Sequence, residues 1–160
     1  MTSLDRLDAR LLELLHAEPH VGVLEASRRL GVARGTVQAR LDKLVGRGVV
    51  RSFGPDVDPA AIGYDVTAFV TLEIRQHGGH DVVAAELARI PEVLEAHTIT
   101  GPGDVLLRIV GRSNADLQRV IDAVVATDGV ERSSTAIALQ TQIGYRVLPL
   151  VKNAVSSSTT

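Results

Sequence analysis

The chain of 160 residues contains no cysteine. It therefore has no disulfide bond, no thiol nucleophile and no thiolate metal site. No apolar run approaches the roughly 18 residues that a membrane-spanning helix needs. The N-terminus carries charges every third or fourth residue instead of an uninterrupted apolar segment, which argues against a signal peptide. We therefore expect a soluble, cytoplasmic protein without a membrane partner.

Motifs of common enzyme and metal-site classes are also missing. The sequence has no Gly-x-Ser-x-Gly elbow, no P-loop and no HExxH motif. Gly101-x-Gly103 is not a dinucleotide fingerprint, because Leu106 stands where the third glycine is needed. His77 and His80 flank two glycines with no third ligand nearby, which favours a surface loop over a metal site. We expect no catalytic residue, no metal and no cofactor.

Positive charge is concentrated in one segment. Residues 1–52 carry nine basic and six acidic side chains, whereas residues 53–160 carry eight and thirteen. From Arg28 to Arg51 there are seven basic side chains and a single acid, Asp42. Such asymmetry suggests a nucleic-acid-binding module joined to a second module of different function.

The stretch from Val23 to Val50 has the pattern of two helices joined by a tight turn. Apolar residues recur at helical spacing on both sides of Gly31, a residue that tolerates positive φ. The two apolar stripes are Val23, Ala26, Leu30 and Val37, Leu41, Leu44. A leucine-rich helix before them, with Ser3 as its expected N-cap, completes a three-helix core. This pattern predicts a helix-turn-helix.

The second of these helices carries a polar and cationic row beside its apolar stripe. The row consists of Thr36, Arg40, Lys43 and Arg47. An isolated row of this kind is often only a solvated helix face. Here it lies on the second helix of a helix-turn-helix, and a slim cationic helix suits a major groove. Residues 49–53 are rich in β-formers and are expected to form a strand of a short wing, so we predict that the protein binds double-stranded DNA.

The side chains expected at the DNA fall into two groups. Those near the start of the helix are expected nearest the bases, and they are Arg34, Thr36, Gln38 and Arg40. Those further along the helix and in the wing are expected mainly on phosphates, and they are Lys43, Arg47 and Arg51.

From residue 66 onward, strand and helix patterns alternate. In residues 66–74 every second side chain, from Val66 to Ile74, is aliphatic, while three of the four between them are polar. This alternation predicts a strand with one apolar face. The expected elements that follow are a helix ended by Pro91, strands over 93–100 and 105–110, a helix over 117–125 and a strand over 130–142. This βαββαβ order predicts a ferredoxin-like fold with both helices on one sheet face. The other face, open and partly apolar, predicts a homodimer.

These patterns together predict an α+β chain with two domains. The expected parts are a winged helix-turn-helix over 1–52, a wing end and linker over 53–65, a ferredoxin-like ligand-binding and oligomerisation domain over 66–148, and a flexible tail over 149–160. The tail is expected because the chain ends in a simple polar run of serine and threonine.

Several short motifs recur in a specific order and spacing. They are Leu4-Asp5-Arg6-Leu7-Asp8, Leu30-Gly31-Val32, Thr36-Val37, Arg40-Leu41, Gly48-Val49-Val50, Asp58-Pro59, Ile62-Gly63, Pro91-Glu92-Val93, Thr100-Gly101, Asp104-Val105-Leu106-Leu107 and Ser134-Thr135. With them the chain resembles the Lrp/AsnC (leucine-responsive/asparagine regulator) family of transcription factors over about residues 4–148. The resemblance implies a sequence-specific DNA-binding regulator with a C-terminal effector and assembly domain. It also implies dimers that often assemble into octamers.

The resemblance further implies a small-molecule effector, usually an amino acid, near a Gly-x-x-Asp turn at contacts between dimers. Carried over by position, the implied effector residues are Thr98, Thr100, Gly101, Gly103, Asp104 and Thr135. Asp104 offers an acceptor for an ammonium group, while the Gly103 N–H and the threonine hydroxyls offer donors for a carboxylate. The alternative is a plain hairpin turn in which Asp104 only caps backbone.

Two further functions are compatible with this architecture. Some relatives with the same two-domain layout act as decarboxylases on tetrapyrroles and have lost DNA binding. The intact basic row and the lack of a histidine cluster argue against that enzyme here. The other alternative is an architectural DNA-binding protein that needs no effector.

Overall fold

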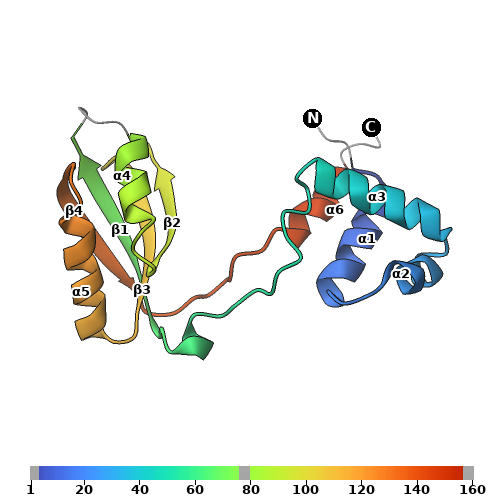
Figure 1. The fold of residues 1–160 in the computed structure, drawn as a ribbon, viewed down its shortest axis with the longest axis horizontal. Coiled ribbons are helices and arrows are strands. Elements are labelled where there is room, and N and C mark those ends of the chain that lie inside the picture. The colour runs from blue at the N-terminus through green and yellow to red at the C-terminus, as the bar shows by residue number, and fades with distance from the viewer. Residues whose placement is uncertain (1–3, 76–79, 157–160) are drawn as a thin grey trace. The chain divides into compact units, whose positions relative to one another are not determined.

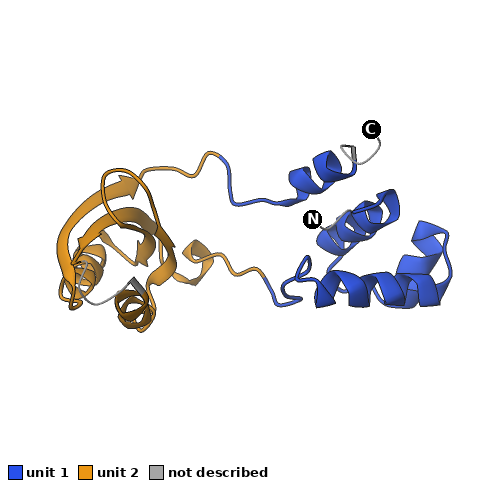
Figure 2. Ribbon diagram, turned by 90° about the horizontal axis from the view of Figure 1, so that it is seen from above, with its two compact units in different colours: residues 1–55, 143–160 blue, residues 56–142 orange. Residues whose placement is uncertain are grey.

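The computed structural model describes residues 4–75 and 80–156. The chain folds into two compact units (Figures 1 and 2). Unit 1 comprises residues 1–55 and 143–160, so it is built from both ends of the chain, and unit 2 comprises residues 56–142. Within the described residues, no helix is both long and apolar enough to cross a membrane.

The regular secondary structure in the described residues of unit 1 is entirely helical. Its helices are α1 (Arg6–Ala17), α2 (Val23–Leu30), α3 (Arg34–Gly46) and α6 (Leu148–Ser156). The fully buried core side chains are Leu11, Ala26, Leu30, Val37 and Leu44, drawn from the first three helices. Between α2 and α3, Gly31 takes φ +71°, a left-handed conformation that glycine adopts without steric cost. The predicted helix-turn-helix is therefore confirmed.

Helix α1 is capped by Asp5 instead of the predicted Ser3, which lies outside the described residues. The Asp5 carboxylate accepts hydrogen bonds from the backbone N–H groups of Leu7 and Asp8 at 2.8 and 2.9 Å. In return, the Asp8 carboxylate accepts one from the Asp5 N–H at 3.2 Å. This capping box satisfies backbone donors that a helix start leaves free. It also holds two carboxylates together at the first turn of α1.

The strand predicted over residues 49–53 is not formed. The N–H groups of Val49 and Val50 donate to the Leu44 carbonyl at 2.9 and 3.2 Å, which folds this segment back onto the end of α3. Both valines pack against the helical core. A strand needs a neighbouring strand to satisfy its backbone N–H and C=O groups, and the described part of unit 1 contains none. The helix-turn-helix of this chain therefore lacks the predicted wing strand.

The tail predicted to be flexible from residue 149 is helical over most of its described length. Helix α6 packs against α1, and Lys152 Nζ lies 3.4 Å from Glu13 Oε1. Leu148, Val151 and Val155 are half-buried at helical spacing. A helix of nine residues is marginal alone, so its stability comes from this packing, which the local sequence does not reveal.

Unit 2 is a four-stranded antiparallel sheet with two helices. Its elements are a 3-10 turn η1 (Ala60–Ile62), β1 (Val66–Ile74), α4 (His80–Leu87), β2 (Val93–Thr98), β3 (Val105–Gly111), α5 (Asn114–Val125) and β4 (Val130–Ala138). The strands lie in the order β2-β3-β1-β4. This is the predicted ferredoxin-like arrangement, with β4 ending at Ala138 instead of residue 142.

Side-chain alternation along β1 defines the two faces of the sheet. Val70 and Leu72 are fully buried on the face that α4 and α5 cover (Figure 1), whereas Phe69 on the opposite face is 42% exposed. Residues opposite one another in an antiparallel pair point to the same side. The open face therefore continues onto β3 through Leu106 and Arg108, which pair with Thr71 and Phe69.

Candidate functional site

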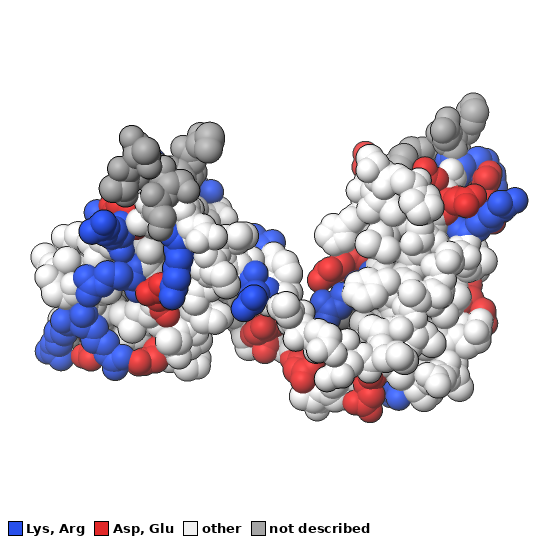
Figure 3. All heavy atoms as spheres, turned by 180° about the vertical axis from the view of Figure 1, so that it is seen from behind, with Lys and Arg blue, Asp and Glu red and all other residues white. Residues whose placement is uncertain are grey.

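The predicted DNA-binding residues of α3 lie on its outer side. Because Val37 and Leu44 are buried in the core, Thr36 and Lys43 point away from it. The exposed members of the predicted set are Arg34, Thr36, Gln38, Lys43, Arg47 and Arg51. Figure 3 shows Lys and Arg side chains gathered on one face of this unit.

Four of the predicted cations form no ion pair within residues 4–75 and 80–156. They are Arg34, Lys43, Arg47 and Arg51. Arg29 in α2 differs, because it contacts Glu18 and its Nε lies 3.0 Å from Glu25 Oε1. Exposed cations without a carboxylate partner are available to phosphate groups.

Arg40 is the exception in the predicted row. Its Nη1 lies 2.5 Å from Asp5 Oδ2 and 2.7 Å from Asp8 Oδ1, and its side chain is only 27% exposed. The Asp8 side chain is 3% exposed. Arg40 therefore joins the middle of α3 to the first turn of α1, unlike the other predicted members of the row. The capping carboxylates of α1 hold its guanidinium.

This contact also affects the ionisation of its members. The hydrogen bond from the Asp8 N–H, together with the Arg40 guanidinium, holds the pKa of Asp5 below its ordinary value. The hydrogen bonds to Asp5 and Asp8 raise the pKa of Arg40. Both shifts favour the charged pair, so the contact persists across the physiological pH range.

The first turn of α3 is open to a ligand. Ala33 occupies the N-cap position and offers no side-chain acceptor to the backbone N–H groups that follow. These donors lie beside Arg34, and the positive end of a helix dipole favours an anion. One turn on, Gln38 donates from Nε2 to Asp42 Oδ1 at 2.8 Å, which fixes the orientation of its amide.

The turn between β2 and β3 is bound tightly to the end of β1. The Asp104 N–H donates to the Leu72 carbonyl at 2.8 Å, and Asp104 Oδ2 accepts from the Ile74 N–H at 2.8 Å. The Gly103 N–H donates to the Gly101 carbonyl at 2.9 Å. The Gly103 amide and one Asp104 oxygen, both expected at the effector, are thus already bonded within the protein.

Gly103 is needed for this close approach. It takes φ +118°, and a Cβ built there would lie 2.4 Å from Thr71 Cγ2 and 3.1 Å from the Leu72 carbonyl oxygen. Gly101 also has a positive φ of +119°, but a Cβ there would meet nothing within 4 Å. Only the second glycine is therefore required by space as well as by backbone conformation.

The remaining predicted effector residues converge only in part. Thr98 ends β2 and Thr100 leads into the turn, and both are exposed. Thr135 of β4 pairs with Val70 and so lies on the helix side of the sheet, whereas Ser134 pairs with Thr71 on the open face. Ser134, and not Thr135, therefore lies on the open face of the sheet, the face on which the turn can be reached by a ligand.

A cavity of about 280 Å³ adjoins this turn on the open face. It is lined by Thr71, Glu73, Pro102, Arg132, Ser133 and Ser134. No local sequence pattern marks its charged members, because Glu73 and Arg132 meet only when β1 and β4 pair. His77 and the side chain of His80, which are predicted to belong to a surface loop, lie outside the described residues. Among the described residues, no group of three or more ionisable side chains is arranged to hold a metal.

Both units match protein-family models. Residues 4–45 match the AsnC-type helix-turn-helix domain, and residues 67–148 match the Lrp/AsnC ligand binding domain. The chain belongs to the Lrp/AsnC family. The predicted fold and the predicted family are thereby confirmed, and the two matches correspond to the helix-turn-helix of unit 1 and the sheet of unit 2.

Relatives within the Lrp/AsnC family match the chain over most of its length. The HTH-type transcriptional regulator FL11 of Pyrococcus horikoshii is 31% identical over 147 residues, which is 92% of this chain and 97% of FL11. The structure of Escherichia coli AsnC matches with a TM-score of 0.83 at 28% identity, covering 91% of this chain and 99% of AsnC. The feast or famine regulatory protein Rv3291c of M. tuberculosis, solved with L-methionine, matches with a TM-score of 0.79 at 28% identity, covering 90% and 97%.

These relatives decide against the enzyme considered above. FL11 and AsnC are named as regulators, so this Lrp/AsnC protein is a DNA-binding transcriptional regulator and not a decarboxylase. Helix α6 begins at the last residue that the ligand-binding model matches. The family motifs therefore could not predict it.

Proposed function

We propose that this Lrp/AsnC regulator places α3 in the major groove of its operator. Arg34, Thr36 and Gln38 then reach base edges from the start of the helix. Lys43, Arg47 and Arg51 lie on phosphates. Support comes from the exposure of these six side chains and from the absence of ion pairs to the four cations within the described residues.

Within this proposal, Arg40 is a positioning residue. Its guanidinium is shared between Asp5 and the buried Asp8, so it fixes the angle at which α3 leaves the core. A small rotation of α3 would move every exposed side chain of the row relative to the duplex. Arg40 thus contributes to DNA binding through the placement of its neighbours.

The open sheet face of unit 2 is proposed to form a homodimer, and such dimers to assemble further toward an octamer. Phe69 on this face is 42% exposed, and a partly apolar open sheet generally becomes covered by a second copy. A dimer presents two α3 helices, which matches the paired half-sites of helix-turn-helix operators.

The effector is proposed to be an amino acid held near the Gly101–Asp104 turn. The residues assigned to it are Thr98, Thr100, Gly101, Gly103 and Asp104, with Ser134 in place of Thr135 because only Ser134 faces the open side of the sheet, and the adjoining cavity adds Glu73 and Arg132. Their opposite charges suit the ammonium and carboxylate groups of an amino acid. The related Rv3291c, solved with L-methionine, supports this ligand class.

The observation that carries the DNA proposal is the exposed, unpaired cationic side of α3. Fluorescence anisotropy on DNA upstream of the regulator's own gene tests it. If Lys43, Arg47 and Arg51 of both protomers in a dimer meet phosphates, the logarithm of affinity falls with the logarithm of salt concentration at a slope of about −5. Lys43→Gln should weaken binding and make this slope shallower by about 2 per dimer.

A matched control uses Arg10→Gln, because Arg10 is also exposed but lies on α1, outside the row. That variant should keep the wild-type affinity and slope. Binding that does not respond to salt, or equal losses for Arg10→Gln and Lys43→Gln, would overturn the proposed interface.

A further inference from the structure

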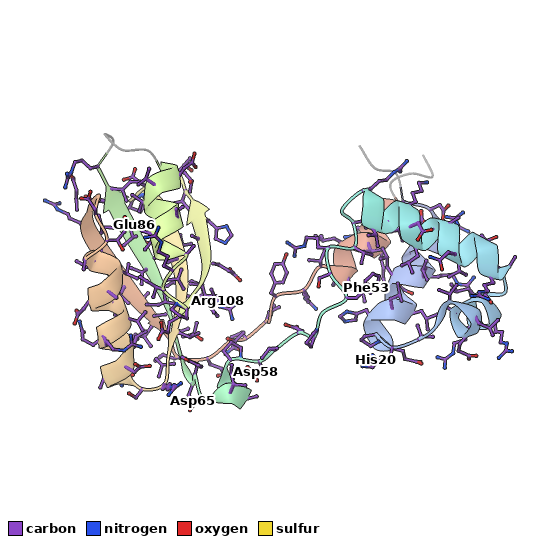
Figure 4. All side chains as sticks on the ribbon, in the orientation of Figure 1. His20, Phe53, Asp58, Asp65, Glu86 and Arg108 are labelled. Carbon is purple, nitrogen blue, oxygen red and sulfur yellow. The ribbon has the colours of Figure 1, made fainter. Side chains whose placement is uncertain are left out.

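Unit 1 contains an apolar cavity of about 550 Å³ beside the packed helices α1 and α6 (Figure 4). From α1, Leu12 and His16 line it, and because they are four residues apart they lie on one side of that helix. From α6, Leu148 and Val151 line it at a spacing of three residues. All of its lining residues belong to unit 1, so the cavity is not part of the sheet face of unit 2 that is assigned to the second protomer.

The apolar walls of this cavity are only partly covered by the protein itself. Leu12, Val49 and Leu148 are half-buried, whereas Tyr145 and Val147 are 79% and 46% exposed. Pockets for small molecules are usually mostly apolar, with volumes of about 300–1,000 Å³. A ligand with an apolar body would remove this surface from water, which favours binding.

The polar side chains of the lining are all hydrogen-bond donors. They are His16, Tyr145 and Arg146, and no carboxylate lines the cavity among the described residues. Arg146 forms no ion pair within residues 4–75 and 80–156. A guanidinium presents paired N–H donors that match a carboxylate, and an imidazole or a hydroxyl can add one more. The cavity therefore offers partners to a carboxylate but none to an ammonium group.

From these observations we infer that the cavity binds a small monocarboxylate with an apolar aromatic or alkyl body and no ammonium group. The ligand carboxylate pairs with Arg146 and accepts a hydrogen bond from His16. Its apolar body lies against Leu12, Val49 and Val151. A free amino acid is disfavoured here, because its ammonium group would lose water without gaining a partner. The cavity therefore differs in ligand class from the effector turn.

Part of this cavity lies beyond the match to the family's ligand-binding domain. That match ends at residue 148, whereas Pro149 and Val151 of α6 also line the cavity. A ligand that contacts α1 and α6 together stabilises their packing. Because α6 follows the segment by which the chain returns from unit 2 to unit 1, such a ligand ties this end of the chain more firmly to the DNA-binding unit. This consequence rests on the proposed regulator function, whereas binding itself does not.

Isothermal titration calorimetry of the full chain with hydrocinnamate, a phenyl ring joined to a carboxylate, tests the inference. Hydrocinnamate should bind at millimolar concentration or below. Hydrocinnamamide lacks the charge and should bind at least tenfold more weakly, and acetate lacks the ring and should give no heat. Hydrogen exchange measured by mass spectrometry should show that hydrocinnamate protects amides of α1 and α6. L-Phenylalanine, which adds an ammonium group to the same body, should not protect them.

Substitution of Arg146 tests the assigned carboxylate partner. Arg146→Gln should weaken hydrocinnamate binding by roughly tenfold to a hundredfold, the range for hydrogen bonds to a charged group. Arg146→Lys should retain part of the affinity, because it keeps the charge but loses the paired donors. Arg10→Gln is the matched control, since Arg10 is also an exposed arginine of unit 1 but does not line the cavity. It should leave binding unchanged.

An Asp104→Asn variant separates this cavity from the effector turn, and it should bind hydrocinnamate as the wild type does. The inference is wrong if hydrocinnamate gives no heat at millimolar concentration, or if Arg146→Gln and Arg10→Gln bind it equally well. Protection of β1 and β3 amides in place of those of α1 and α6 would assign the carboxylate to the effector turn and would also overturn the inference. None of these measurements involves DNA, so such a failure would leave the proposed regulator function intact.

Discussion

The sequence predicts two ligand-binding segments, the outer side of α3 and the turn between β2 and β3. They differ in whether their polar groups already have partners within the protein. On α3, Arg34 and Lys43 are exposed and form no ion pair within the described residues. In the turn, the Gly103 amide and one Asp104 oxygen are bonded to unit 2 itself. Residue type and spacing therefore identify candidates for binding, but their partners within the fold decide which groups remain available.

The largest expected effect tests whether the turn is primarily structural. Gly103→Ala should destabilise unit 2 by about 3 kcal/mol, because it combines a strained positive φ with a clash against β1. Gly101→Ala has a similar φ but open space, so it should cost only about 1–2 kcal/mol. Native-state hydrogen exchange of amides in β1 and β3 measures both values. Equal costs for the two variants would contradict the assigned contact with Thr71.

Within α3, the second prediction separates a positioning residue from a DNA contact. Arg40→Gln and Asp8→Asn should each destabilise unit 1 by about 2 kcal/mol, because each removes part of a charged hydrogen-bond network around the nearly buried Asp8. Hydrogen exchange of α1 and α3 amides measures this loss. Lys43→Gln is the control, since Lys43 is exposed and should leave stability unchanged.

DNA binding by the same variants distinguishes the two roles further. Arg40→Gln should reduce affinity but keep the wild-type salt slope, because it removes no phosphate contact. Asp8→Asn should reduce affinity in the same way, although removing an acid from a DNA-binding unit would ordinarily favour binding. A shallower salt slope for Arg40→Gln, with unchanged stability, would show instead that Arg40 contacts the backbone of the duplex.

The sequence is informative wherever a local pattern determines the structure. The alternation along β1 predicts the buried face of the sheet, and the apolar spacing around Gly31 predicts the helix-turn-helix. Both predictions succeed because burial of one face is the main stabilising term for each element. The short motifs that carry the family resemblance then give the order of the two domains.

The features that the sequence does not reveal share one physical cause, which is that the deciding partner lies far away in sequence. Arg40 has the spacing of a DNA-binding residue, and its ion pairs with α1 form only in the folded chain. Thr135 differs from Ser134 only through the register of β4 on β1. Helix α6 forms because α1 covers its apolar side. None of these contacts is encoded within a single local stretch.

The smallest expected effect is the loss of stability at low pH. It tests whether the contact between α1 and α3 makes unit 1 sensitive to acid independently of unit 2. The pKa of Asp5 is lowered by the Asp8 N–H and by Arg40. A carboxylate with a lowered folded pKa contributes its full stability above the unfolded value, 3.8 for Asp5, and loses it as the pH falls through the folded value. Unit 1 should therefore lose stability as the pH falls below about 4. The loss is modest because Asp5 is 53% exposed and water screens it.

Unit 2 supplies the comparison, because the pKa of Asp116 at the start of α5 is also lowered, first by the Arg112 N–H and then by Arg119. Asp5→Asn should flatten the acid dependence of α1 and α3 amide exchange and leave the sheet unchanged, whereas Asp116→Asn should do the reverse. If Asp5→Asn flattened both units equally, acid would be acting on the net charge of the whole chain. Separate responses would instead show that each carboxylate stabilises only its own unit, and that α3 depends on the first turn of α1.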